Sequence, residues 1–226
     1  MPVSSKNGHI TFSKTSMSNS TGDRLPFSLE QTQAIQHHLI RKERWRDLAL
    51  FTVGVDSHLR SSDLLVLRVC DLADPNGRVR ERIFGRQRKN KPTYEGYLSE
   101  PTQEAVRHWI EVSGKSSSDF LFTPIKGEAE RPIRRETFGR LVKQWAEAIG
   151  LDPIYYSTKS LRKSRIRSIL EAADYDYQVP KEVLNHADIR STIYYCRLER
   201  DRAFAISRSV KFFKPMDLHP SKDVPS

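Results

Sequence analysis

The 226-residue sequence contains only two cysteines, Cys70 and Cys196. Two thiols by themselves can form neither a disulfide framework nor a thiolate zinc site, so both of these classes of domain are excluded. Cys70 adjoins the apolar run of residues 64–69, and we therefore expect it to be a core residue. Cys196 directly follows Tyr195, and nothing around it indicates a nucleophilic thiol.

Long apolar runs are also missing. No segment approaches the roughly 18 apolar residues of a membrane span, and residues 1–22 lack the apolar core of a signal peptide. Hydrophobic residues make up 37% of the chain and charged residues 29%, with a mean hydropathy of -0.61. The sequence therefore predicts a polar protein with no membrane partner and a cytoplasmic location.

Acidic residues are fewer than basic ones, at 28 against 38. The resulting formal charge of +10 and the isoelectric point near 9.7 favour a polyanionic partner, nucleic acid above all. The alternative is a basic surface that only keeps the protein soluble.

Hydrophobic periodicity divides the chain into a flexible N-terminal arm (1–25), one domain (26–213) and a C-terminal tail (214–226). The domain is mostly helical in pattern, but alternating apolar residues flank a basic turn between residues 77 and 98, which indicates a β-hairpin. We therefore predict an α+β, mainly helical fold with a small antiparallel sheet. Helices are expected near residues 28–41, 43–55, 100–113, 135–149, 158–172, 180–184, 189–195 and 199–210. Another is expected to begin near Ser61 or Ser62 and to carry Leu64, Leu65 and Leu67 towards the core.

Three basic residues stand where an anion could be bound. Arg60 precedes a predicted helix, whose first backbone N–H groups favour an anion. Lys159 and Arg162 lie three residues apart and so share one face of a helix, where the guanidinium could bind two phosphate oxygens. Each has a plainer interpretation: Arg60 could pair with Asp63, and the other two could belong to a solvated basic face.

Further polar residues could complete such a site. His186 follows an apolar helix end, and Tyr195 lies nine residues later beside Tyr194. Lys89 and Lys91 lie in the basic turn of the hairpin. A tyrosine hydroxyl, with a pKa near 10, attacks poorly at neutral pH unless cations and a proton acceptor surround it. The alternatives are a structural histidine, a partly buried tyrosine pair and a solvated turn.

In this order and spacing the residues resemble the catalytic domain of the tyrosine recombinase (phage integrase) family. Residues 57–65, Ser-His-Leu-Arg-Ser-Ser-Asp-Leu-Leu, are similar to the family's first box, with His58 where glycine is usual. The family's hairpin lysine lies eight residues before a Pro-Leu-like strand end, which selects Lys89 over Lys91.

The later boxes also resemble the family's. Lys159 stands where the second box usually has histidine, three residues before Arg162. Residues 184–186, Leu-Asn-His, are similar to the usual Leu-Gly-His, and the family's nucleophile nine residues further on corresponds to Tyr195. The resemblance covers about residues 27–210.

The resemblance implies a mechanism in which a tyrosine attacks a DNA phosphate, forms a 3′-phosphotyrosyl link and frees a 5′ hydroxyl, without metal or ATP. The basic residues would stabilise the charge on phosphorus, Lys89 would protonate the leaving oxygen, and His186 would bind a phosphate oxygen or help deprotonate the tyrosine. The catalytic residues so implied are Arg60, Lys89, Lys159, Arg162, His186 and Tyr195.

The partners implied are double-stranded DNA recombination sites, three further protomers in a tetramer on DNA, and accessory DNA-bending proteins. The helix at 199–210 could dock on a neighbouring protomer or on its own domain. With about 25 residues before the first helix, we expect the short form without a separate N-terminal helical domain. Such a protein resembles fimbrial-switch inversion proteins, or the resolvases of plasmids and mobile elements.

Two alternatives stay open at this point. A type IB topoisomerase-like enzyme would nick and close DNA as a monomer with the same chemistry. A non-catalytic DNA-binding protein could share the fold, although the intact set of polar residues argues against it.

Overall fold

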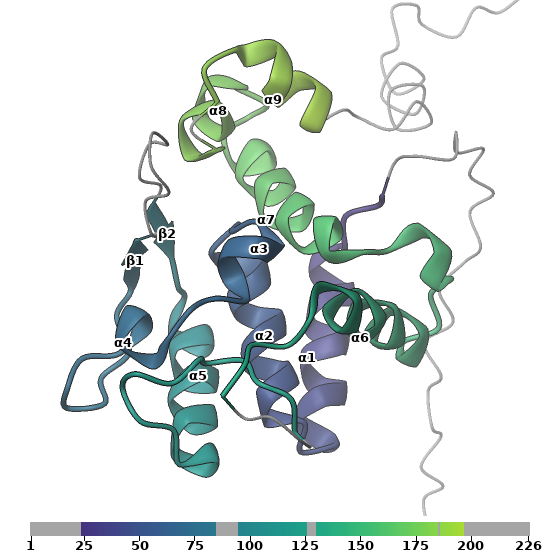
Figure 1. Cartoon of the computed structure of the whole chain (residues 1–226). Helices are drawn as coiled ribbons and strands as arrows, with labels where there is room; N and C mark the ends of the chain where they lie inside the picture. The colour runs from purple at the N-terminus through teal and green to yellow at the C-terminus, as the bar shows by residue number, and fades with distance from the viewer. Residues whose placement is uncertain (1–23, 85–94, 126–129, 185, 197–226) are drawn as a thin grey trace, which may run out of the picture.

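The computed structural model describes residues 24–84, 95–125, 130–184 and 186–196 (Figure 1). Helix α1 (Leu29–Arg41) begins at a capping box, in which the Ser28 hydroxyl accepts a hydrogen bond from Gln31 N and the Gln31 side chain accepts one from Ser28 N. This satisfies two of the backbone donors that a helix start leaves without partners. The predicted start of the first helix is thereby confirmed.

Helix α2 (Trp45–Asp56) is the centre of the domain, in contact with α1, α5 (Glu100–Ser113) and α7 (Thr158–Ala172). A helix surrounded in this way is apolar on most of its faces, and Leu50, Phe51 and Val53 are almost completely buried. Gly54 lets α7 approach closely, because a Cβ atom at this position would lie 2.9 Å from Leu161 Cδ1.

The small sheet pairs β1 (Arg82–Phe84) with β2 (Glu95–Tyr97) in antiparallel register, with Ile83 opposite Gly96. The predicted hairpin is thus confirmed at both strands, whereas its basic tip lies outside the described residues. A Cβ atom at Gly96 would lie 3.1 Å from the Ser57 carbonyl oxygen. Glycine therefore allows β2 to lie directly against the turn that precedes Arg60.

Two one-turn helices connect α2 to the sheet, α3 (Ser61–Leu64) and α4 (Val69–Leu72). Leu64, Leu65 and Leu67 are buried, as predicted. The prediction that Cys70 is a core residue is wrong, because its side chain is exposed. In α4 the buried positions are Val69 and Leu72, which places Cys70 on the outward side of the turn.

The C-terminal half of the described chain is helical, and α8 (Gln178–Leu184) and α9 (Ile189–Tyr195) lie together beside α7 at the top of Figure 1. Within the described residues, no helix is both long enough and apolar enough to cross a membrane. The predicted helix at 199–210 lies outside the described residues. The remaining elements are α6 (Arg135–Ala148) and η1 (Pro153–Tyr155).

Candidate functional site

Arg60 projects from a turn whose backbone has an unusual conformation. His58 has φ +44°, in the left-handed region that glycine adopts without cost. This conformation is a physical reason for the glycine that is usual at this position of the resembled box. Leu59 is buried beside it, whereas Arg60 is exposed at the start of α3.

The plainer interpretation of Arg60, an ion pair with Asp63, is not seen in the described part of the chain. Asp63 instead accepts a 3.3 Å hydrogen bond from the Ser62 hydroxyl. The Arg60 guanidinium therefore remains available to bind an anion.

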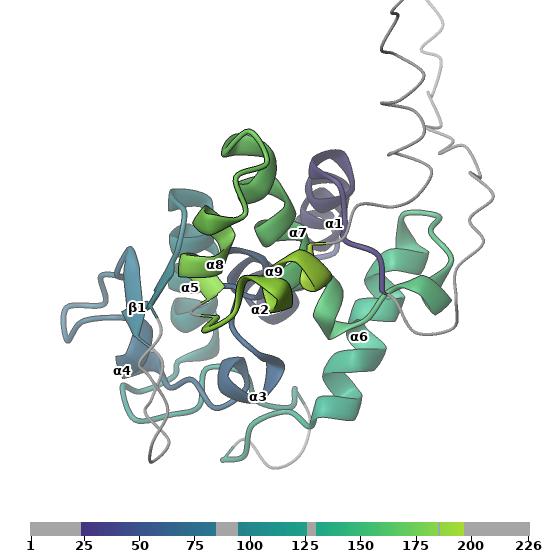
Figure 2. The same cartoon turned by 90° about the horizontal axis from the view of Figure 1, so that it is seen from above.

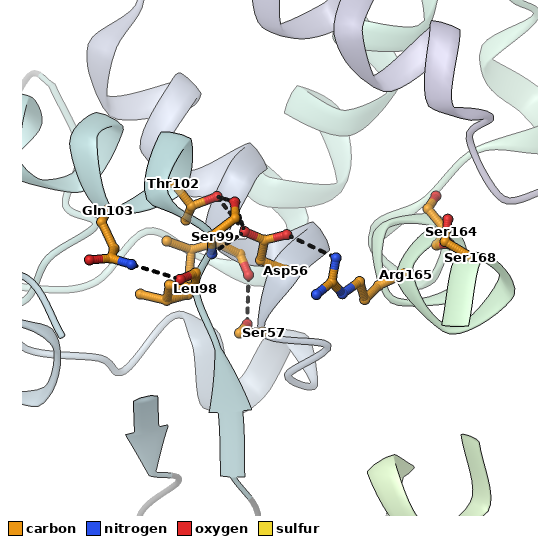
Figure 3. A network of polar contacts seen from close by, with 10 residues as sticks. Asp56, Ser57, Leu98, Ser99, Thr102, Gln103, Ser164, Arg165 and Ser168 are labelled. Atoms are coloured by element: carbon orange, nitrogen blue, oxygen red, sulfur yellow. Dashed lines mark hydrogen bonds and ion pairs between the residues drawn. The ribbon is translucent and has the colours of Figure 1, made fainter. Parts of the chain in front are cut away.

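A buried carboxylate at the end of α2, just before the turn that carries Arg60, is held in a network of polar contacts (Figure 3). Asp56, only 8% exposed, lies at the end of α2. Its Oδ2 accepts hydrogen bonds from Ser99 N at 2.8 Å, from the Ser99 hydroxyl, and from the Thr102 hydroxyl at 2.6 Å. Its Oδ1 lies 3.6 Å from Arg165 Nη1. Asp56 thus joins the ends of α2 and α5 to α7, a role that the sequence analysis missed.

The start of α7 carries the second pair of predicted residues. A capping box at Ser157 begins the helix, with Lys159 exposed in its first turn and Arg162 half-buried one turn later. The basic run that follows is not one solvated face. Arg165 pairs with Asp56, and the Arg167 Nε donates to Glu171 at 3.2 Å.

Helix α9 carries the predicted nucleophile at its last residue. Asp188 begins this helix by accepting a 2.9 Å hydrogen bond from Arg190 N. The Tyr195 hydroxyl is buried and has no hydrogen-bond partner in the described part of the molecule. Burial raises the pKa of Tyr195 to about 12, although Arg162 and Arg60 act in the opposite direction.

His186 lies close to the Tyr195 ring. Its ring centroid is 6.3 Å from that of Tyr195, with the two rings at 82°. Its Nδ1 lies 2.9 Å from the Thr192 hydroxyl, which fixes the orientation of the ring. Burial, with Arg162 and Arg60 nearby, lowers the pKa of His186, so the neutral imidazole is favoured as a proton acceptor.

One pocket of about 390 Å³ brings most of these side chains together. Six basic residues and no carboxylate are among the described residues that line it, so it suits an anion. It contains four predicted residues, and three basic residues that the sequence analysis did not single out. The predicted ones are Arg60, Lys159, Arg162 and Tyr195, and the additional ones are Arg24, Arg135 and Lys163.

Two predicted residues are not among the described residues that line the pocket. His186 is not part of the pocket lining but adjoins it through the Tyr195 ring. Lys89 lies outside the described residues, so its position stays a prediction. In the described part of the chain, no three His, Cys, Asp or Glu side chains gather as the ligands of a metal ion would.

The fold is that of a tyrosine recombinase catalytic domain. XerA recombinase superposes with a TM-score of 0.66 at 17% identity, covering 84% of this chain and 67% of that one. XerH site-specific recombinase, solved in a post-cleavage complex with its palindromic difH substrate, gives a TM-score of 0.63 at 18% identity, covering 81% and 52%.

Sequence similarity identifies the same family as the fold does. Residues 27–202 match the model of the Phage integrase family, and the chain belongs to that family. It is 26% identical over 181 residues to the probable integrase/recombinase YoeC of Bacillus subtilis (strain 168), covering 77% of this chain and 89% of YoeC. It is 30% identical over 154 residues to tyrosine recombinase XerC of Xanthomonas axonopodis pv. citri (strain 306), covering 68% and 47%. The chain thus spans about half the length of this XerC relative.

Proposed function

We propose that the protein is a site-specific recombinase that cuts and rejoins double-stranded DNA through a 3′-phosphotyrosyl link to Tyr195. The observation that carries the proposal is the buried Tyr195 hydroxyl, without a hydrogen-bond partner in the described residues, beside a pocket lined by basic side chains. Membership of the Phage integrase family supports it, as does the solved complex of XerH with its DNA substrate.

In the proposed reaction the Tyr195 oxygen forms a bond to phosphorus while the bond from phosphorus to the 5′ oxygen breaks. Arg60, Lys159 and Arg162 stabilise the negative charge of the pentacoordinate transition state, and each such donor is worth on the order of 3 kcal/mol. The phosphodiester energy is kept in the protein–DNA bond, so attack by the free 5′ hydroxyl of a second strand reverses the step.

Two proton transfers accompany this exchange. The Tyr195 proton leaves as the nucleophile attacks, and the neutral His186 ring beside it is the proposed acceptor or phosphate ligand. The departing 5′ oxygen takes up a proton, which we assign to Lys89 because of its place in the resembled hairpin.

Recombination between two sites requires two DNA duplexes and, in the proposed assembly, four protomers, with accessory DNA-bending proteins where the sites demand them. The outcome is inversion, resolution or integration, depending on how the two sites are arranged. The reaction would take place in the cytoplasm.

The proposal is tested with a nicked suicide duplex that traps the covalent intermediate. The target is first selected from random-sequence duplexes by binding to the protein. We expect wild-type protein to form an adduct that is stable on a denaturing gel, and Tyr195→Phe to form less than about one-thousandth as much, since phenylalanine has no nucleophilic oxygen.

Tyr194→Phe is the matched control, because it removes the neighbouring hydroxyl and should leave the adduct in place. An adduct that survives Tyr195→Phe would overturn the assignment of the nucleophile. Strand exchange between two differently labelled sites separates a recombinase from a nicking-closing enzyme, which would relax supercoiled DNA as a monomer and form no four-way junction.

A further inference from the structure

The segment from Arg24 to Phe27 precedes α1 and is fixed against η1 and α7. Leu25 N donates a 3.0 Å hydrogen bond to the Tyr155 carbonyl, and Phe27 N donates one of 2.8 Å to the buried Ser164 hydroxyl. The Phe27 ring stacks on the Tyr156 ring, with centroids 4.5 Å apart and planes 16° apart. The segment therefore holds a defined position although it lies outside any helix or strand.

This anchoring places Arg24 in the lining of the pocket that contains Tyr195. Its guanidinium donates to the Ile154 carbonyl, which fixes one nitrogen and leaves the other donors of the fork available. Arg135 reaches the same pocket from the first residue of α6. In Figure 2, α6 and the segment before α1 lie on the same side of α9.

The basic residues of the pocket differ in their position relative to the Tyr195 ring. Arg162 Cζ and Lys163 Nζ lie over the ring, 5.6 and 6.0 Å from its centroid. Arg24 and Arg135 line the same pocket from the segment before α1 and from the start of α6, without such a contact in the described part of the chain. They are thus available to an anion other than the reacting phosphate.

The size of the pocket is consistent with a second anion. A volume of about 390 Å³ corresponds to roughly thirteen molecules of liquid water. A phosphodiester group, with five non-hydrogen atoms, fills only part of it. The start of α6 adds to the attraction, because its N-cap residue Arg134 provides no side-chain cap for the first backbone N–H groups.

We infer that Arg24 and Arg135 bind the backbone phosphate adjacent to the one that Tyr195 attacks, in the same DNA strand. The inference rests on the proposed function and extends it. Binding the strand at two successive phosphates fixes both its position and its direction, which aligns the scissile bond with the tyrosine oxygen.

The test uses the selected suicide duplex with one methylphosphonate, which is neutral, in place of the phosphate on either side of the cleaved bond. Wild-type protein should bind one of these two duplexes about ten-fold more weakly than the unmodified duplex. Arg24→Gln and Arg135→Gln should each bind the unmodified duplex about three-fold more weakly and lose only about three-fold more on that neutralised duplex, whereas the double variant should lose about ten-fold and show no further loss. Arg140→Gln, an exposed residue of α6 outside this pocket, should behave like wild type.

Full sensitivity of both variants to both neutralised positions would overturn the inference, as would wild-type affinity in both variants. If one variant fails to fold, as judged by circular dichroism, the other carries the same test. Adduct formation by the wild type is measured in parallel. Absence of an adduct refutes the proposed function, whereas an adduct together with insensitive variants refutes only the second phosphate site.

Discussion

His58 shows how a single residue can make the stability of the domain depend on pH. Its side chain is buried, and its Nε2 has no hydrogen-bond partner in the described part of the chain. Burial, followed by the charges of Arg162 and Arg165 on α7, lowers the pKa of His58 to about 4, although the backbone carbonyls of Asp56 and Val183 favour the proton. The folded protein therefore excludes a proton that the unfolded chain binds below about pH 6.5.

The contribution of His58 to stability is present above pH 6.5 and is lost as the pH falls towards 4. We expect His58→Asn to lose less stability over this interval, by on the order of 2 kcal/mol, because asparagine tolerates a left-handed backbone and does not titrate. Urea unfolding at pH 7.5, 5.5 and 4.5 measures the difference. Parallel pH profiles for the two proteins would contradict the assignment.

At the scale of the elements, the Asp56 carboxylate joins three helices behind the pocket. Asp56→Ala should cost about 3 kcal/mol in unfolding free energy, because the Thr102 hydroxyl and the Arg165 charge lose their common partner. Asp56→Asn keeps an acceptor for the hydroxyl groups and should cost less. Thermal or urea unfolding gives both values.

A purely structural effect would leave chemistry unchanged once the protein is folded and saturated with DNA. We expect Asp56→Ala also to slow single-turnover cleavage at saturating DNA, about ten-fold, since the turn carrying Arg60 shifts relative to α7. Glu111→Ala, which breaks an exposed pair with Arg107, is the matched control and should change neither quantity by much. Equal cleavage rates in Asp56→Ala and wild type would limit Asp56 to stability.

The accuracy with which the sequence predicts the structure also differs between elements. The amphipathic helix α5 was predicted with the bounds that the structure has, because its apolar spacing persists over several turns. The one-turn α4 gives no such period, which is why Cys70 was placed in the core. Arg24 and Arg135 could not be assigned to the site, since only the packing of segments distant in sequence brings them to one pocket.

At the scale of the whole molecule, the net charge of +10 should make the affinity for DNA depend on salt concentration. If six or more phosphates are neutralised, affinity should fall by about 10³-fold or more between 50 and 200 mM salt. The rate of the cleavage step should depend much less on salt concentration, because the charges in the pocket act at short range and are partly buried. Binding isotherms measure the salt dependence of DNA affinity, and single-turnover rates at saturating protein measure that of the cleavage step. A rate that falls in parallel with affinity would contradict this division.

The burial of the Tyr195 hydroxyl has a consequence for the genome as a whole. With a pKa of about 12, roughly one molecule in 10⁵ carries an ionised tyrosine at pH 7. Under the proposed function, a protein that scans chromosomal DNA passes vast numbers of phosphodiester bonds of identical chemistry. Under that function, damage at these bonds would be avoided because the Tyr195 hydroxyl keeps its proton by default and would gain reactivity only when a correctly seated phosphate and a proton acceptor are both present. Fidelity would thus begin with the chemistry of one side chain, before any base is read.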